Sequence, residues 1–264
     1  MNARAPLLHG KVAIISGVGP GLSRGMALEL ADHGAEVVLV ARRQERLDAV
    51  AGEVSAQGGA ALTVAADITR QDECREVVRR AIDRFGRVDV LVNNAYFGAT
   101  THPFLDTFTS GVWQDAMAVN LFGSLTMTHA AAGEMVASGG GSIVMVASMA
   151  IRDIQPNQGP YATSKAALVA ATKTLARELG PSGVRVNAVV PGYIAGPAVD
   201  AWMARSAANR GISPAEVEQE LVERMALRFV PSDRDIAGSV VWLASELARP
   251  VTGIAVDVNG GYFI

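Results

Sequence analysis

The 264-residue chain is poor in several groups on which other protein classes depend. It has one cysteine, Cys74, so no disulfide can form within the chain, and we interpret this thiol as a packing or surface residue. The formal net charge is −3, so the chain lacks the overall excess of positive charge that is typical of nucleic-acid-binding proteins. No run of about 18 apolar residues occurs, so no transmembrane helix is expected. The N-terminal residues lack a basic start followed by an apolar run, so we expect no signal peptide and a cytoplasmic location.

Histidine and lysine are also scarce. The four histidines are scattered without the spacing of metal ligands, so no metal cofactor is expected. The three lysines are Lys11, Lys165 and Lys173, and arginine supplies most of the positive charge. No Pro/Ser-rich linker, internal repeat or low-complexity tract occurs, which favours a single domain over residues 1–264.

Hydrophobic residues make up 50% of the chain and follow two alternating patterns. Short continuous Val, Ile, Ala and Leu runs are typical of strands covered on both faces, and longer segments with helical periodicity separate them. The strands are expected at residues 12–16, 36–41, 60–66, 88–93, 142–148, 184–190 and 254–258. The helices are expected at 22–33, 44–57, 70–85, 111–138, 161–179 and 233–245. This alternation predicts an α/β, doubly wound Rossmann-type three-layer sandwich with a mostly parallel seven-stranded sheet.

Residues 192–231 interrupt this alternation. The region contains Pro197 and Pro214, with helix-like pieces near 198–209 and 214–225. A long insertion between a strand and the next helix often forms a binding loop or lid, and we expect this one to contact substrate. A surface helical excursion without a binding role is the alternative.

The first expected strand runs into a glycine-rich turn, Ser-Gly-Val-Gly-Pro-Gly-Leu-Ser, at residues 16–23. Glycines at a strand-to-helix turn let the backbone approach a pyrophosphate without interference from a Cβ atom. The helix N-terminus that follows offers unpaired N–H groups to the phosphates. The spacing differs from G-x-G-x-x-G, and a plain connection between strand and helix is the alternative.

The second strand indicates which nucleotide is bound. NAD-specific sites of this type usually place a carboxylate near the end of this strand. Here the strand ends in Ala41, and Arg42 and Arg43 follow. Arginine suits a 2′-phosphate through bidentate, charge-assisted bonds, so the sequence predicts NADP(H). The alternative is that both arginines merely begin a solvated helix.

Tyr161 and Lys165 are four residues apart in an expected helix, so their side chains share one face. A neighbouring ammonium favours the phenolate, and we expect it to lower the tyrosine pKa towards neutrality, where general acid–base catalysis is efficient. Ser148 is expected to end the strand at 142–148, where its hydroxyl could donate to a substrate oxygen. An ordinary exposed helix pair and a turn serine are the alternatives.

Further short motifs follow the remaining strands. They are Asp67 in Ala-Asp-Ile-Thr, Asn93-Asn94-Ala95, Pro191-Gly192 and Asn259-Gly260-Gly261. With the turn at 16–23, they resemble the T-G-x-x-x-G-x-G, aspartate, N-N-A-G, P-G and G-G motifs of the short-chain dehydrogenase/reductase family. Asn120, Ser148, Tyr161 and Lys165 match its catalytic tetrad in order and spacing. The resemblance covers residues 10–262.

The resemblance implies a nicotinamide-dependent oxidoreductase that interconverts a carbonyl and a secondary alcohol by hydride transfer. Tyr161 would exchange the proton with the substrate oxygen, and Lys165 would lower its pKa and bind the nicotinamide ribose. Ser148 would polarise the substrate oxygen, and Asn120 would hold a water that links Lys165 to solvent. The residues implied to bind NADP, or NAD as the alternative, are Gly17, Gly19, Gly21, Leu22, Ser23, Arg42, Arg43, Asp67, Ile68, Asn94, Ala95, Tyr161, Lys165, Pro191, Gly192 and Ile194.

Three positions depart from the family pattern. Ser23 replaces the third glycine of the turn, where its side chain is expected to tighten packing against the pyrophosphate. Tyr96 replaces the glycine of N-N-A-G and is expected to shape the mouth of the active site. Gly196 replaces a frequent threonine, so anchoring of the carboxamide is expected to rely on the backbone of Ile194.

The segments expected near the pocket are mainly apolar, which predicts a hydrophobic ketone or alcohol as substrate. The expected pocket residues are Tyr96, Met149, Ile154, Tyr193 and Trp202. The resemblance also implies a homotetramer or homodimer, with the helices that begin near residues 111 and 161 at one interface. Three alternatives stay open: an NAD-dependent dehydrogenase of a steroid or cyclic secondary alcohol, a non-redox lyase or dehalogenase, and a non-catalytic dinucleotide sensor.

Overall fold

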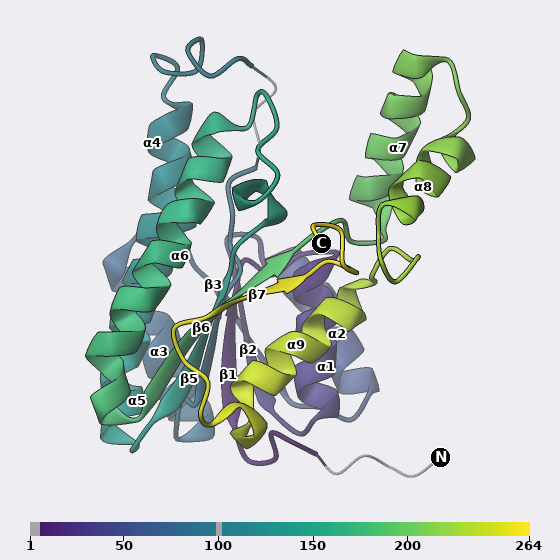
Figure 1. Cartoon of the computed structure of the whole chain (residues 1–264). Coiled ribbons are helices and arrows are strands. Elements are labelled where there is room, and N and C mark those ends of the chain that lie inside the picture. The colour runs from purple at the N-terminus through teal and green to yellow at the C-terminus, as the bar shows by residue number, and fades with distance from the viewer. Residues whose placement is uncertain (1–5, 99–101) are drawn as a thin grey trace.

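The computed structural model describes residues 6–98 and 102–264, which form a seven-stranded parallel sheet with helices on both faces (Figure 1). The strand order is β3-β2-β1-β4-β5-β6-β7, so the chain winds outward from β1 in one direction and then from β4 in the other. The strands are β1 (Val12–Ser16), β2 (Glu36–Ala41), β3 (Ala61–Ala65), β4 (Val90–Asn93), β5 (Gly141–Val146), β6 (Val184–Pro191) and β7 (Ala255–Val258). Every pairing is parallel, which confirms the predicted fold class. The reversal between β1 and β4 places a crevice at their carboxyl ends.

The continuous apolar strands arise because each strand faces two hydrophobic cores. Side chains alternate between the faces of a strand. In β1, Ala13 and Ile15 belong to one core, whereas Val12 and Ile14 belong to the other. All five β1 residues are buried, so the strand has no side that faces solvent. Its sequence therefore does not alternate between apolar and polar residues.

Two sets of helices cover the sheet (Figure 1). One core contains residues of α1 (Leu22–Asp32), α2 (Gln44–Ala56) and α9 (Asp233–Ala244). The other contains residues of α3 (Gln71–Phe85), α5 (Ser124–Ala137) and α6 (Gly159–Leu179). These helices match the predicted segments within about two residues, except for the segment at 111–138.

The helix expected at 111–138 is not continuous. It consists of α4 (Val112–Ala116), a π-helical turn at Met117–Gly123 and α5. The wider turn contains Asn120, whose carbonyl oxygen accepts a 3.1 Å hydrogen bond from the Ser124 hydroxyl. Apolar periodicity could not reveal this feature, because one widened turn leaves the average pattern of the segment intact. Turns of this kind are frequent at functional sites.

The prediction that Ser148 ends a strand is wrong. β5 ends at Val146, and Ser148 is the N-cap of a short 3-10 helix at Met149–Ile151. Its hydroxyl oxygen accepts a 3.2 Å hydrogen bond from the Ala150 N–H, an ordinary way to satisfy the first amides of a helix. Ser148 therefore lies just beyond the carboxyl edge of the sheet.

The insertion after β6 forms α7 (Pro197–Arg210) and α8 (Pro214–Glu223), close to the two expected pieces. The pair projects beyond the carboxyl end of the sheet (Figure 1). α8 begins with a capping box between Ser213 and Glu216. Within the described ranges, no helix combines the length and apolar character needed to cross a bilayer.

Candidate active site

The glycine-rich turn lies between the ends of β1, β2 and β4. The Val18 N–H donates to the Val40 carbonyl over 3.0 Å, which holds the turn against β2. Gly17 has a φ of 73°, and a Cβ atom there would lie 2.2 Å from the Cα of Ala95. Gly21, with a φ of 107°, is the N-cap of α1, whose first residue is Leu22. The turn therefore requires glycine for backbone conformation and for close approach, and it exposes a helix N-terminus suited to phosphate.

Ser23 has a role within the turn itself, which the sequence does not reveal. Its buried hydroxyl accepts a 3.0 Å hydrogen bond from the Gly19 N–H and donates a 3.2 Å bond to the Gly19 carbonyl. The side chain thus closes the turn on itself. The side chain in place of glycine stiffens the backbone of the turn.

The segment after β4 is fastened to the turn. The Ser16 hydroxyl accepts hydrogen bonds from the N–H groups of Asn94 at 3.2 Å and Ala95 at 3.4 Å. The Asn94 side-chain amide donates to the Gly17 carbonyl over 3.0 Å. These bonds join two predicted nucleotide-binding segments into one wall of the crevice.

The candidate adenosine end of the crevice carries charges of both signs. Arg42 and Arg43 are exposed directly after β2. Burial raises the pKa of Asp67, but hydrogen bonds from Thr69 and the positive charges of Arg42 and Arg70 outweigh it, so this pKa is lowered overall. Ile68 is buried beside Asp67. The structure therefore brings these predicted residues to one side of the turn.

Asn120 connects the crevice to the helix that carries the tyrosine. Its side-chain oxygen accepts a 2.6 Å hydrogen bond from the Phe97 N–H, and its amide donates 3.2 Å to the Phe97 carbonyl. The same amide donates 2.8 Å to the hydroxyl of Ser164 in α6. The side chain of Asn120 thus fixes the segment that bears Tyr96, a role that the sequence does not reveal.

Tyr161 and Lys165 share one face of α6, as predicted. The Lys165 ammonium lies 6.0 Å from the centroid of the Tyr161 ring and donates 2.7 Å to the Val146 carbonyl. Burial lowers the pKa of Lys165 to about 7. Since an ammonium has three N–H donors, two stay available for other acceptors.

The predicted lowering of the Tyr161 pKa is wrong for this structure. Burial raises the pKa of Tyr161, the neighbouring Ser148 hydroxyl opposes that shift, and the Tyr96 phenol adds to it. The side chain of Tyr161 is partly buried, and loss of hydration penalises the phenolate more than its surroundings favour it. Tyr161 therefore carries its proton at neutral pH, and Ser148 and Tyr96 both lie within electrostatic reach of it.

The loop after β6 is held close to the sheet. A Cβ atom at Gly192 would lie 2.6 Å from the Cβ of Asn259, which explains the glycine after Pro191. The Ala195 N–H donates to the Pro231 carbonyl over 2.8 Å. Ile194 precedes this anchored residue, so its backbone is held near the end of β6.

The predicted pocket residues form two groups. Tyr193 and Trp202 stack with ring centroids 4.9 Å apart, and Tyr262, which was not predicted, packs edge-on against Tyr193 at 5.5 Å. Burial raises the pKa of Tyr193 to about 12. Tyr96 and Ile154 are 65% and 75% exposed, so they lie at the rim rather than inside. Met149 is half-buried in the 3-10 turn after Ser148.

Sequence reasoning missed two residues beside the site. Ser164 binds Asn120, and its position three residues after Tyr161 gave no distinguishing pattern. A guanidinium nitrogen of Arg46 lies 3.8 Å from where a Cβ of Gly19 would stand. The sequence pattern that could have identified Arg46 is its position on the first turn of α2, shortly after Arg42 and Arg43.

Comparison with known proteins decides the family. The sequence profile of the family described as enoyl-(acyl carrier protein) reductase matches residues 17–263. The chain belongs to the short-chain dehydrogenase/reductase family. As a short-chain dehydrogenase/reductase, it is an NAD(P)-dependent oxidoreductase that acts on ketone or alcohol substrates.

Several short-chain dehydrogenases/reductases match nearly the whole chain. A 3-oxoacyl-[acyl-carrier-protein] reductase FabG of Staphylococcus epidermidis is 32% identical over 255 residues, which cover 96% of this chain and 99% of that protein. An A-factor type gamma-butyrolactone 1'-reductase of Streptomyces virginiae is 35% identical over 265 residues and 100% of both proteins.

Solved structures agree with these relatives. A 7 alpha-hydroxysteroid dehydrogenase in complex with NADH and 7-oxo glycochenodeoxycholic acid superposes with a TM-score of 0.87 at 32% identity, over 99% of this chain and 97% of that one. A short-chain type dehydrogenase/reductase from Mycobacterium ulcerans gives a TM-score of 0.87 at 30% identity, over 97% and 90%.

Proposed function

We propose that this protein is an NADP(H)-dependent reductase of hydrophobic ketones, which also oxidises the corresponding secondary alcohols. The observation that carries the proposal is the position of the partly buried, protonated Tyr161 phenol beside Ser148 and Lys165, at the sheet edge that bears the glycine turn. A protonated phenol suits donation to a carbonyl oxygen, the proton step of reduction.

The crevice fits a nicotinamide dinucleotide. Gly17 and Gly21 adopt the positive φ that a phosphate-binding turn requires, and the turn leads into the N-terminus of α1. Arg42, Arg43 and Arg46 supply positive charge near this turn, with no carboxylate at the end of β2. This arrangement favours a 2′-phosphate, hence NADP(H). We assign the other predicted nucleotide-binding residues to the adenine, the ribose and the carboxamide of the dinucleotide. They are Asp67, Ile68, Asn94, Ala95, Gly192 and Ile194.

When bound, the nicotinamide supplies or accepts the hydride at the substrate carbon. Tyr161 donates its phenolic proton to the substrate oxygen during reduction and becomes a phenolate; in the reverse direction the phenolate takes the proton of the alcohol. The Ser148 hydroxyl orients that oxygen and stabilises developing negative charge. Lys165 directs its remaining N–H donors to the nicotinamide ribose hydroxyls, and Asn120 holds the Tyr96–Phe97 segment and α6 in register through Ser164.

The substrate portion next to the carbonyl is apolar. Tyr193 and Trp202 form an aromatic wall, and Met149 lies beside Ser148. Tyr96 and Ile154 border the entrance. Apolar walls with a few convergent polar groups are typical of sites for small hydrophobic ligands.

An NAD-dependent alcohol dehydrogenase is the second candidate, because the structural neighbour 7 alpha-hydroxysteroid dehydrogenase was determined with NADH. The absence of a carboxylate after β2 disfavours it here. A lyase would not need the glycine turn, and a non-catalytic sensor would not need the Tyr161–Lys165 pair, so both are less favoured.

Initial rates on a panel of hydrophobic ketones and secondary alcohols, each with NADPH and NADH, test the proposal. We expect turnover of apolar ketones with a clear preference for NADPH. Equal or better rates with NADH would replace the NADP(H) assignment by the second candidate. No turnover of any ketone or alcohol with either nucleotide would reject the proposed reaction.

The assembly and location stay predictions. We propose a homodimer or homotetramer in which α4, α5 and α6 contribute to an interface. Phe122 and Val136, 57% and 40% exposed on this helical layer, are apolar groups that such an interface would cover. The cytoplasmic location expected from the sequence also remains to be tested.

A further inference from the structure

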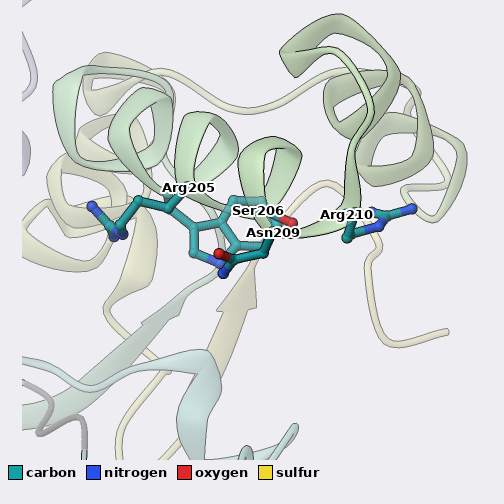
Figure 2. A pocket seen from close by; sticks show the side chains of 5 residues that line it. Arg205, Ser206, Asn209 and Arg210 are labelled. Carbon is teal, nitrogen blue, oxygen red and sulfur yellow. The ribbon is translucent and has the colours of Figure 1, made fainter.

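One face of α7 carries Trp202, already assigned to the substrate, together with polar side chains that have no role in the proposed reaction. Trp202, Arg205, Ser206 and Asn209 are spaced i, i+3, i+4 and i+7, so they lie on the same side of the helix. With Arg210 they line an open pocket of about 400 Å³ (Figure 2).

Trp202 joins this face to the body of the protein. The ring of Trp202 stacks on Tyr193, which follows the carboxyl end of β6, with 4.9 Å between the centroids. Arg205, Ser206 and Asn209 are one and two helical turns beyond Trp202 on the same side. Trp202 therefore belongs both to the pocket and to the aromatic wall assigned above to the substrate.

The pocket carries two positively charged side chains, and only one of them is paired with a carboxylate of the described residues. Arg210 forms an ion pair of 2.6 Å with Glu220 of α8. Across the described part of the chain, the exposed Arg205 has neither an ion-pair partner nor a side-chain hydrogen bond. The one carboxylate of α7, Asp200, lies five positions earlier and on a different side of the helix. None of the described residues that line the pocket is a carboxylate, whereas Ser206 and Asn209 add hydroxyl and amide donors.

We propose that the α7 pocket binds a carboxylate at the distal end of the substrate. The inference rests on the proposed function: the ketone reacts at Tyr161, its apolar part lies along Tyr193 and Trp202, and its carboxylate pairs with Arg205. A planar guanidinium with free N–H groups matches the two oxygens of a carboxylate. The natural substrate is then an amphipathic oxo acid rather than a purely hydrophobic ketone.

The test compares methyl ketones with a terminal carboxylate, on alkyl chains of increasing length, with their methyl esters. The quantity measured is the ratio of kcat/KM for the acid to kcat/KM for the ester of the same chain length. We expect the ratio for the wild-type protein to exceed one at the chain lengths that span the distance from Tyr161 to Arg205. It should fall roughly tenfold in R205E and less in R205K, mainly through KM, and fall with added salt.

Arg249 provides the matched control. It is exposed, follows the 3-10 helix at Glu246–Ala248 and precedes the amino end of β7, at the opposite edge of the sheet. R249E makes the same change in net charge and should keep the wild-type ratio. An equal fall in R249E would show that net charge, and not the α7 pocket, sets the preference.

The two proposals fail in different ways. If the wild-type protein reduces the esters but prefers no acid, or if R205E keeps the wild-type ratio, the carboxylate pocket is wrong and the reductase stands. A similar loss of NADPH affinity in R205E would also overturn the inference, since Arg205 would then act on the nucleotide. Failure to reduce either ketone series with either nucleotide would reject the reductase itself.

Discussion

The Lys165 ammonium donates a 2.7 Å hydrogen bond to the carbonyl oxygen of Val146, the last residue of β5. The bond fastens α6 to the carboxyl edge of the sheet and buries the amine almost completely, at 2% exposure. Burial is the cause that lowers the pKa of Lys165 to about 7 from its usual 10.5. This single side chain therefore links the stability of the fold to pH near neutrality.

Replacing Lys165 by methionine should remove that link. Between pH 7 and 10.5 the unfolded chain retains a proton that folded Lys165 has released, so the lowered pKa makes the wild-type protein more stable as pH rises through this window. Urea unfolding across this range should show the free energy of unfolding of the wild type rising relative to K165M. K173M, a change at an exposed lysine, should follow the wild type. If the free energies of unfolding of the wild type and K165M changed in parallel with pH, the lowered pKa would not belong to Lys165.

Replacing Tyr161 by phenylalanine should abolish reduction while nucleotide binding persists. The expected loss in kcat is at least about a hundredfold, because no other group is assigned to the proton transfer. Since burial raises the pKa of Tyr161 from its ordinary value, deprotonation of this group should not reduce the reductase activity of the wild type at neutral or mildly alkaline pH. Initial rates and nucleotide titrations of Y161F measure both effects. Y262F, which changes a phenol in the neighbouring aromatic cluster, is the control, and a matching loss there would remove the special role of Tyr161.

Replacing Arg42 by alanine should change the choice of nucleotide more than the chemistry. The side chain is exposed, so we expect a loss of about tenfold in kcat/KM for NADPH and little change for NADH. Arg75 is an exposed arginine on α3, and R75A provides the charge-matched control. If R42A lowered kcat/KM equally for NADPH and NADH, Arg42 would bind a part of the molecule that the two nucleotides share.

Replacing Gly17 by alanine should destabilise the protein by about 2–4 kcal/mol, because the new Cβ would collide with the Ala95 backbone and the φ is positive. Gly10 separates these causes: its φ is 71°, against 73° for Gly17, but nothing lies within 4 Å of its Cβ position. G10A should therefore cost only about 1 kcal/mol, the strain alone. Equal effects in thermal or urea unfolding would show that the close approach to Ala95 is unimportant.

Local patterns were sufficient to predict much of the fold. The continuous apolar runs of β1 and β2 identified strands with two covered faces, and both strands have the predicted bounds. Alternation with helices then specified a doubly wound sheet, because a parallel crossover needs a helix. The glycine turn, Tyr161 and Lys165 were also visible, since their spacing along the chain reflects local geometry.

Interactions between distant residues were not visible. The bonds from Asn120 to Phe97 and Ser164 join three segments, and the π-helical turn that positions Asn120 does not alter the apolar pattern. The direction of the Tyr161 pKa shift was predicted wrongly for the same reason. An i, i+4 spacing reports a neighbouring ammonium, whereas desolvation depends on every segment that covers the phenol.

The sequence alone determined the order of strands and helices and the chemical groups available at the sheet edge, because periodicity and turn chemistry act over a few residues. Only the tertiary structure decided which of these groups are buried, which meet, and that Arg205 lines one pocket with Trp202 without an ion-pair partner among the described residues. Burial and pairing depend on contacts between segments that are remote along the chain, and local sequence carries no record of them.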